Sequence, residues 1–241
     1  MKKFGLIGKK LGHSYSKSFF EHYFVEKGID ATYDNLEIAE IDEVEAILNG
    51  DYHGINVTLP YKEQIIPYLD ELDEVAEEIG SVNVVKIDHG KCTGYNSDAY
   101  GFQQMIKPFL TNKHEKAIVF GTGGASKSIN YVLEHLGIEV LSVSRTPKAG
   151  QFSYDQLNDL MIQSCKLIVN TTPVGMFPRM DEELPVDLSA LTPDHLVVDL
   201  IYNPRETKLL QKANLAGAIT LNGESMLREQ ALKAWEIWDH L

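Results

Sequence analysis

The fold is decided by residues 117–146, AIVFGTGGASKSINYVLEHLGIEVLSVSRT. The apolar run 117–120 predicts a buried strand, the glycines that follow predict a tight turn, and the next residues have the spacing of a helix. A second apolar run, 138–143, predicts another strand. A strand, glycine turn, helix and strand in this order form a βαβ unit, and such a first turn is typical of dinucleotide-binding sheets. The sequence therefore predicts an α/β protein with a Rossmann-type domain.

The glycines have a physical reason in such a turn. Gly121 lets the chain leave the strand sharply, and Gly123 lets backbone amides approach a pyrophosphate at the positive end of the next helix. Ser126 stands where the dinucleotide fingerprint has its third glycine, and it is small enough for the helix to pack on the strand. A tight turn without a ligand is the alternative interpretation of this motif.

The residues after the second strand indicate which dinucleotide is bound. They are Ser144, Arg145 and Thr146, and no Asp or Glu follows before Asp155. An acidic residue here would accept a hydrogen bond from the ribose of NAD, whereas an arginine suits the 2′-phosphate of NADP. A guanidinium can bind a phosphate through two parallel hydrogen bonds. We therefore expect NADP rather than NAD, the alternative being a solvated arginine on a loop.

Composition excludes several classes of function. The chain has 241 residues, 44% of them hydrophobic and 24% charged, as in a globular protein with a substantial core. No apolar run approaches the ~20 residues that span a membrane, and the start leads into a strand rather than a signal peptide, so we expect a cytoplasmic protein. The net charge of −13 argues against nucleic acid. Cys92 and Cys165 lie in unrelated contexts, so free thiols and no metal site are expected.

The rest of the chain predicts further strands and helices around this unit. Strands are expected at 4–7, 31–38, 54–58, 166–170, 196–201 and 218–220, and a hairpin at 82–95. Helices are expected at 16–27, 41–48, 62–79 with a break near Pro67, 99–110, 154–161, 207–214 and 225–241. Ser16 offers an N-cap for the first helix, while Gly28 and Gly80 mark helix ends.

Polar residues lie at the carboxyl end of the expected strand 54–58 and just after it. Asn56, Thr58 and Lys62 lie near its carboxyl end, where open α/β sheets bind their ligands. Taken alone, Lys62 is also typical of a solvated surface lysine, and Asp98 is typical of a helix cap.

Several short motifs, in the same order over nearly the whole chain, resemble those of the shikimate dehydrogenase family. They are residues 8–16, 56–62, 80–83, 94–101, 121–126, 144–146, 170–176, 199–210 and 222–230. The sequence departs from the family pattern at Lys10 and Lys17, where the family has proline, and at Ser144, where it has asparagine.

The resemblance implies a fold and an activity. It implies a substrate-binding domain at 1–98, completed by a C-terminal helix at 224–241 that returns to it, and a Rossmann-type NADP-binding domain at 99–223. The implied reaction is the reversible NADPH-dependent reduction of 3-dehydroshikimate to shikimate, in the pathway to chorismate and aromatic amino acids. The implied partner is this small-molecule substrate, with no nucleic acid or membrane, in a monomer or homodimer. The alternatives are a dual shikimate/quinate dehydrogenase that uses NAD or NADP, and a catalytically silent dinucleotide-binding sensor.

The resemblance also implies site residues. Lys62 and Asp98 would be the catalytic pair, because an ammonium can stabilise a forming alkoxide and pass it a proton while a carboxylate orients the lysine. Substrate would be bound by short polar side chains, namely Ser14, Ser16, Asn56, Thr58, Asn83, Tyr202 and Gln230. The cofactor would be bound by Gly121, Gly123, Gly124 and Ala125 at the pyrophosphate, by Ser144, Arg145 and Thr146 at the 2′-phosphate, and by Thr171, Met176 and Gly223 near the nicotinamide.

Overall fold

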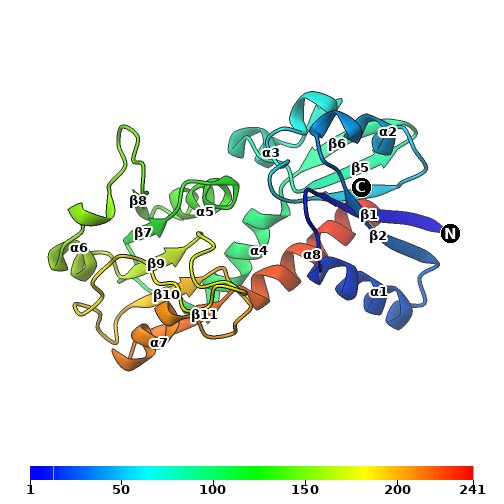
Figure 1. Ribbon diagram of the computed structural model, residues 1–241. Helices are drawn as coiled ribbons and strands as arrows, with labels where there is room; N and C mark the ends of the chain where they lie inside the picture. Colours follow the sequence, from blue (N-terminus) through cyan, green and yellow to red (C-terminus); the bar gives the residue numbers. More distant parts are fainter. Residues whose placement is uncertain (13, 241) are drawn as a thin grey trace. The chain divides into compact units, whose positions relative to one another are not determined.

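The computed structural model describes residues 1–12 and 14–240. His13, which belongs to the first family motif, and Leu241 lie outside the described residues. The chain divides into two compact units: unit 1 comprises 1–101 and 227–241, and unit 2 comprises 102–226 (Figure 1). The sequence placed these boundaries after residues 98 and 223. No helix in the described ranges is long and apolar enough to cross a membrane.

Unit 1 is built on a six-stranded mixed sheet with the order β2-β1-β3-β5-β6-β4. Its strands are β1 (Lys2–Gly8), β2 (Ala31–Glu37), β3 (Gly54–Val57), β4 (Glu71–Leu72), β5 (Val84–Asp88) and β6 (Lys91–Tyr95). Its helical segments are α1 (Tyr15–Lys27), η1 (Ile41–Glu43), α2 (Val44–Leu48), η2 (Ile66–Tyr68), α3 (Glu74–Ile79) and the start of α4 (Ser97–Ile106). β1 pairs in parallel with β2 and β3, whereas β5 is antiparallel to β3 and β6.

Both faces of this sheet are covered, because apolar residues point to opposite sides along β1. Phe4 belongs to an aromatic cluster with α1 and the end of α8 (Glu224–His240), and Figure 1 shows these two helices side by side, α1 in blue and α8 in red. Ile7 belongs to the cluster on the other face, with α2. Trp238 stacks on Phe4 with 4.8 Å between ring centroids, and its indole donates to the carbonyl of Val85 at 3.0 Å.

Two sequence-based expectations about unit 1 were wrong. The helix expected at 62–79 is a series of turns, the 3-10 segment η2, the strand β4 and only then α3, because Glu71 and Leu72 pair with β6. The first helix is capped by Ser14, whose hydroxyl accepts from the amide of Lys17 at 3.3 Å, rather than by Ser16. Gly28 and Gly80 end their helices in the left-handed conformation, as expected.

Unit 2 is built on a five-stranded sheet with the order β11-β10-β9-β7-β8, and all its neighbouring strands are parallel. The strands are β7 (Lys116–Phe120), β8 (Glu139–Val143), β9 (Leu167–Asn170), β10 (Leu196–Asp199) and β11 (Ile219–Asn222). The chain passes from β7 to β8 on one side and then to β9 on the other. This reversal is a topological switch point, and ligands bind at the carboxyl ends of the strands there. The Rossmann-type prediction is therefore confirmed.

The helices of unit 2 are α5 (Gly124–His135), α6 (Asp159–Ser164) and α7 (Lys208–Leu215), with the 3-10 segments η3 (Lys107–Phe109) and η4 (Tyr154–Gln156) and part of α4 and α8. The helix expected at 154–161 is wrong in its position. The chain forms η4 first, and Asn158 then caps α6 by accepting from the amide of Met161 at 3.1 Å. An Asn side chain that caps a helix starts it at this point and not earlier.

Candidate active site

The two residues expected to form a catalytic pair are in contact in unit 1. Nζ of Lys62 lies 2.5 Å from Oδ2 of Asp98, and the side chains are 14% and 10% exposed. Lys62 follows the turn after β3, and its carbonyl accepts from the amide of Val82 at 2.8 Å, which ties this turn to the segment before β5. Asp98 lies in the first turn of α4. The pair is therefore fixed by the backbone on both sides and largely shielded from solvent.

Asp98 is not the helix cap that it resembles when taken alone. The amide of Ala99 donates to Oδ1 of Asn96 at 3.2 Å, so Asn96 has the capping contact. The carboxylate of Asp98 instead accepts from Lys62 on one oxygen and from Nδ2 of Asn83 on the other, at 2.9 Å. A carboxylate with charged and amide donors on its two oxygens has a fixed orientation.

Asn83 is bonded on both ends of its side-chain amide. Its Nδ2 donates to the hydroxyl of Ser97 at 3.0 Å as well as to Asp98, and its Oδ1 accepts from the amide of Ser97 at 2.7 Å. The Ser97 hydroxyl in turn donates to Gln230 on α8 at 3.4 Å. Four predicted site residues, Lys62, Asp98, Asn83 and Gln230, thus belong to one hydrogen-bonded group. Ser97 joins them and was not singled out from the sequence, although it lies in the family motif 94–101.

Asn56 extends this group along β3. Its Nδ2 donates to the carbonyl of Asn83 at 3.2 Å, and its Oδ1 accepts from the hydroxyl of Tyr33 at 2.7 Å. Ser16, which is half-buried in α1, lowers the pKa of Tyr33 and so opposes the effect of burial. Sequence reasoning missed Tyr33, because it lies within β2 and away from any motif. Its role could be seen only from the side-chain contacts.

The other predicted substrate residues are placed as follows. Ser14 and Thr58 are half-buried on neighbouring loops of unit 1, and the amide of Thr58 donates to the carbonyl of Ile7 at 2.9 Å. Tyr202 belongs to unit 2, where it follows β10 and is 37% exposed.

The glycine turn of unit 2 has the geometry expected of a phosphate-binding turn. Gly121 has φ +103°, and a Cβ there would lie 2.6 Å from Oγ1 of Thr171. Gly123 is the N-cap of α5 and provides no side-chain cap, and a Cβ on it would meet nothing within 4 Å. The first amides of α5, at Gly124 and Ala125, therefore adjoin open space beside a helix N-terminus, which is where a pyrophosphate binds.

The end of β8 provides the residues expected for the 2′-phosphate. Ser144 is buried, and its hydroxyl accepts from the amide of Thr146 at 3.3 Å. The hydroxyls of Ser144 and Thr122 lie 3.5 Å apart, which links this loop to the glycine turn. Arg145 and Thr146 are exposed. An exposed guanidinium next to small hydroxyl groups fits a phosphate ester, so the donors present in unit 2 suit NADP.

The loops after β9 and β10 meet at a buried carboxylate that the sequence did not single out. Asp199 accepts from Nδ2 of Asn170 at 3.0 Å, from the amide of Ile201 at 3.1 Å and from the hydroxyl of Thr207 at 2.6 Å. Burial raises its pKa to about 6, against the opposing effect of these three donors. Oδ1 of Asn170 accepts from Thr172, so Asp199 holds the loop that carries Thr171 and Met176.

The turn after β11 is equally constrained. The amide of Gly223 donates to the carbonyl of Ile201 at 3.1 Å, and a Cβ at Gly223 would lie 2.0 Å from the carbonyl oxygen of Leu200. Only glycine fits here without a shift of the backbone. Met176 is 42% exposed at the neighbouring loop, and its amide donates to the carbonyl of Pro173 at 3.2 Å.

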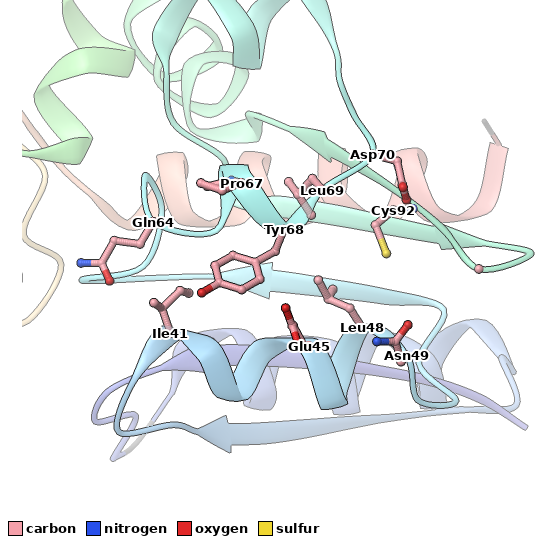
Figure 2. Close-up of a pocket in the computed structure, with 11 residues that line it drawn as sticks. Ile41, Glu45, Leu48, Asn49, Gln64, Pro67, Tyr68, Leu69, Asp70 and Cys92 are labelled. Atoms are coloured by element: carbon pink, nitrogen blue, oxygen red, sulfur yellow. Dashed lines mark hydrogen bonds between the residues drawn. The ribbon is translucent and has the colours of Figure 1, made fainter.

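Unit 1 also contains a cavity of about 830 Å³ (Figure 2). Figure 2 shows Tyr68, Leu48 and Glu45 at its walls, between α2 and η2, with the buried free thiol of Cys92 next to Asp70. Its lining contains none of the predicted site residues that the structure describes. Within the described ranges, no group of three or more His, Cys, Asp or Glu side chains is placed to hold a metal ion.

The parallel sheet of unit 2, with its switch point and glycine turn, and the shielded lysine–aspartate pair of unit 1 define a Rossmann-type α/β protein that also carries a polar site. Residues 6–85 match the family model of the shikimate dehydrogenase substrate binding domain. A shikimate dehydrogenase (NADP(+)) of Halothermothrix orenii is 38% identical and aligns over 97% of this chain and 89% of its own length. The chain belongs to the shikimate dehydrogenase family.

Solved structures agree with this assignment. A crystal structure of a shikimate dehydrogenase in complex with NADP+ has a TM-score of 0.89 and 32% identity, and covers 100% of this chain and 90% of its own. A quinate dehydrogenase from Corynebacterium glutamicum in complex with NAD has a TM-score of 0.90 and 29% identity, and covers 100% of this chain and 94% of its own.

Proposed function

We propose that this protein catalyses the reversible reduction of 3-dehydroshikimate to shikimate with NADPH, in the pathway to chorismate and aromatic amino acids. The observation that carries the proposal is the 2.5 Å contact between Lys62 and Asp98, held inside a group of polar side chains in a chain of this family. Unit 1 binds the substrate and unit 2 binds the cofactor. The substrate is a small molecule, and the protein acts in the cytoplasm as a monomer or homodimer.

Lys62 is the acid and base of this reaction. NADPH, when bound, supplies the hydride that the carbonyl carbon gains. The ammonium of Lys62 stabilises the negative charge that develops on the carbonyl oxygen and gives it a proton, which leaves a neutral amine. In the reverse direction the neutral amine takes the proton of the hydroxyl group. Asp98 keeps the lysine in place through both directions, because Asn83 holds its second oxygen.

The remaining polar residues bind the hydroxyl and carboxylate groups of shikimate. Asn56, Ser14, Ser16, Thr58, Asn83 and Gln230 in unit 1 and Tyr202 in unit 2 are the proposed ligands. A substrate hydroxyl both donates and accepts, and so do the amide and hydroxyl side chains in this set. A site built on such bonds rejects analogues that lack the matching group, because its own polar groups are then left unpaired.

The cofactor is held by unit 2. The turn with Gly121 and Gly123 and the first amides of α5 take the pyrophosphate, and Arg145 with its neighbours takes the 2′-phosphate. The residues after β8 favour NADP over NAD, since no carboxylate follows the strand before Asp155. The curated relative is named as an NADP(+) enzyme, and a dual shikimate/quinate dehydrogenase or a silent sensor is not favoured.

A direct assay tests this function. Purified protein is incubated with shikimate and either NADP+ or NAD+, and then with quinate in place of shikimate, while the absorbance of the reduced nicotinamide is followed. We expect a strong rise with shikimate and NADP+. A comparable rise with quinate or NAD+ would instead support the dual-specificity alternative. No rise with any pair, from folded protein that still binds NADPH, would support the sensor.

A further inference from the structure

The hydroxyl of Tyr33 is buried at the centre of the polar group in unit 1. Tyr33 is 3% exposed, and its ring stacks on Phe20 with 4.7 Å between centroids and 15° between planes. The ring cannot move away without opening the aromatic cluster around α1. The position of the hydroxyl is therefore set by packing and not by the polar residues that it contacts.

This hydroxyl reaches across a strand. Tyr33 lies on β2 and is in register with Phe4 of β1, whereas Asn56 lies on β3 and is in register with Leu6 of the same strand. Because β1 lies between β2 and β3, the phenol spans it to meet the amide of Asn56 at 2.7 Å. One hydroxyl thus fixes a proposed substrate ligand of β3 from the far side of β1.

The direction of these bonds follows from the chemistry of the groups. Burial raises the pKa of Tyr33 well above its ordinary value of 10, so the phenol keeps its proton. Asn56 accepts that proton on Oδ1 and donates from Nδ2 to the carbonyl of Asn83 at 3.2 Å. The amide of Asn56 is therefore held at both ends, and a rotation by half a turn would place its oxygen against the carbonyl oxygen of Asn83, acceptor against acceptor.

We propose that Tyr33 is a positioning residue, whose hydroxyl holds the amide of Asn56 in the orientation that binds a substrate hydroxyl. This inference rests on the proposed function, because it assumes that Asn56 contacts the substrate. Tyr33 itself touches neither substrate nor the reacting atoms. Without the Tyr33 hydroxyl, Asn56 loses the hydrogen-bond donor that fixes its side-chain oxygen. Substrate binding then weakens while the Lys62–Asp98 pair stays in place.

Tyr33→Phe tests the proposal, with Tyr52→Phe as the matched control. The hydroxyl of Tyr52 also donates to a side chain of unit 1, that of Asp34 at 3.2 Å, and Asp34 is not a proposed site residue. We expect Tyr33→Phe to raise the KM for shikimate by about 10-fold, with kcat and the KM for NADP+ within about 3-fold of wild type. Tyr52→Phe should leave all three constants unchanged. A merely structural role would lower the melting temperature and the fraction of active protein without raising the KM for shikimate. A rise of less than about 5-fold overturns the proposal.

A double-mutant cycle with Asn56→Ala tests whether Tyr33 acts through Asn56. Once Asn56 is removed, Tyr33→Phe should add less than about 3-fold to the KM for shikimate. A full additional effect in the Asn56→Ala background would overturn the proposed route.

A wild-type protein that does not oxidise shikimate would refute the proposed function, and no variant is needed to see this. The positioning role of Tyr33 can be tested separately on the unmodified protein, even if Tyr33→Phe does not fold. NMR of labelled protein should show a slowly exchanging hydroxyl proton of Tyr33 with a through-space contact to the Asn56 side-chain amide. A rapidly exchanging hydroxyl, or an Asn56 amide that is averaged by rotation, would refute the positioning role.

Discussion

The carboxylate of Asp98 holds the ammonium of Lys62 at 2.5 Å, and neither side chain is more than 14% exposed. A lysine on a protein surface would move freely and make a weak ion pair. Here the partner is fixed in turn by Asn83, so the position of the lysine nitrogen is determined by β3, β5 and the start of α4 together. The pair is therefore suited to a proton transfer that requires a defined position.

Lys62→Ala should lower kcat for shikimate oxidation by about 100-fold or more, with a smaller change in KM, because the lysine acts mostly in the transition state. The measurement is steady-state oxidation of shikimate with NADP+. Lys91→Ala is the control, since Lys91 forms an ion pair with Glu71 at 2.6 Å in the same unit, but an exposed one. An unchanged kcat in Lys62→Ala would remove the lysine from the chemistry.

Arg145→Ala should raise the KM for NADPH by about 10-fold or more, since a charge-assisted contact to the 2′-phosphate is lost. The KM for NADH should change little, because NADH has no such phosphate. Both constants are measured with 3-dehydroshikimate in excess. Arg179→Ala removes another exposed arginine of unit 2, one paired with Glu182, and should alter neither constant. Equal effects on the two cofactors would argue against the assignment.

Gly223→Ala should destabilise the protein by roughly 3 kcal/mol or more, because the new Cβ would overlap the backbone of Leu200. Gly123→Ala adds the same methyl group where no protein atom lies within 4 Å, so the free energy of unfolding should change by no more than about 1 kcal/mol. Urea unfolding of both variants compares the two positions directly. Similar losses of stability would show that the turn at Gly223 can relax.

The pKa of Asp199, raised from 3.8 to about 6, predicts a pH dependence of stability. The native state then binds a proton more tightly than the unfolded state, so this carboxyl stabilises the fold fully below its unfolded pKa. The contribution is lost as pH rises through the folded value, and a shift of about two units corresponds to about 3 kcal/mol.

Asp199→Asn should therefore gain stability relative to wild type as pH rises from about 4 to about 7. Urea unfolding over this range measures the free energy of unfolding of both proteins. The contributions of the other carboxylates are common to both and cancel in the difference. Asp187→Asn is a control that should show no change over this range, because hydrogen bonds from Ser189 lower the pKa of the exposed Asp187 below 3.8, and its contribution changes only below about pH 4. A difference that does not change with pH would show that Asp199 is not strained by its burial.

Local signals in the sequence predicted most elements of the fold. Glycine ends helices at Gly28 and Gly80 because the left-handed conformation is available to it without strain, and this can be predicted from the residue alone. The expected helix at 62–79 was wrong because Glu71 and Leu72 pair with β6, a contact with residues some way along the chain. Non-local pairing of this kind overrides helix spacing.

The candidate site could be predicted only in part for the same reason. The motifs singled out Lys62 and Asp98, and the structure brings them into contact. Tyr33 lies outside the family motifs, and Asp199, although it begins the motif 199–210, has no further signal that separates it from an ordinary strand-end aspartate. Their importance depends on which strands become neighbours in the sheet. It also depends on which hydrogen-bond partners the fold places beside each buried side chain.

The indole of Trp238 fills space that Gly54 leaves open, and it closes the sheet of unit 1 near the end of the chain. A ribosome makes residues 1–101 first, then the whole of unit 2, and only afterwards the helix that carries Trp238. At a synthesis rate of about 5–20 residues per second, the early part waits on the order of ten seconds with Phe4 and Phe24 uncovered. The part of the chain made second is thus the first that can finish folding, whereas the first part keeps these rings uncovered until the helix that carries Trp238 has been made.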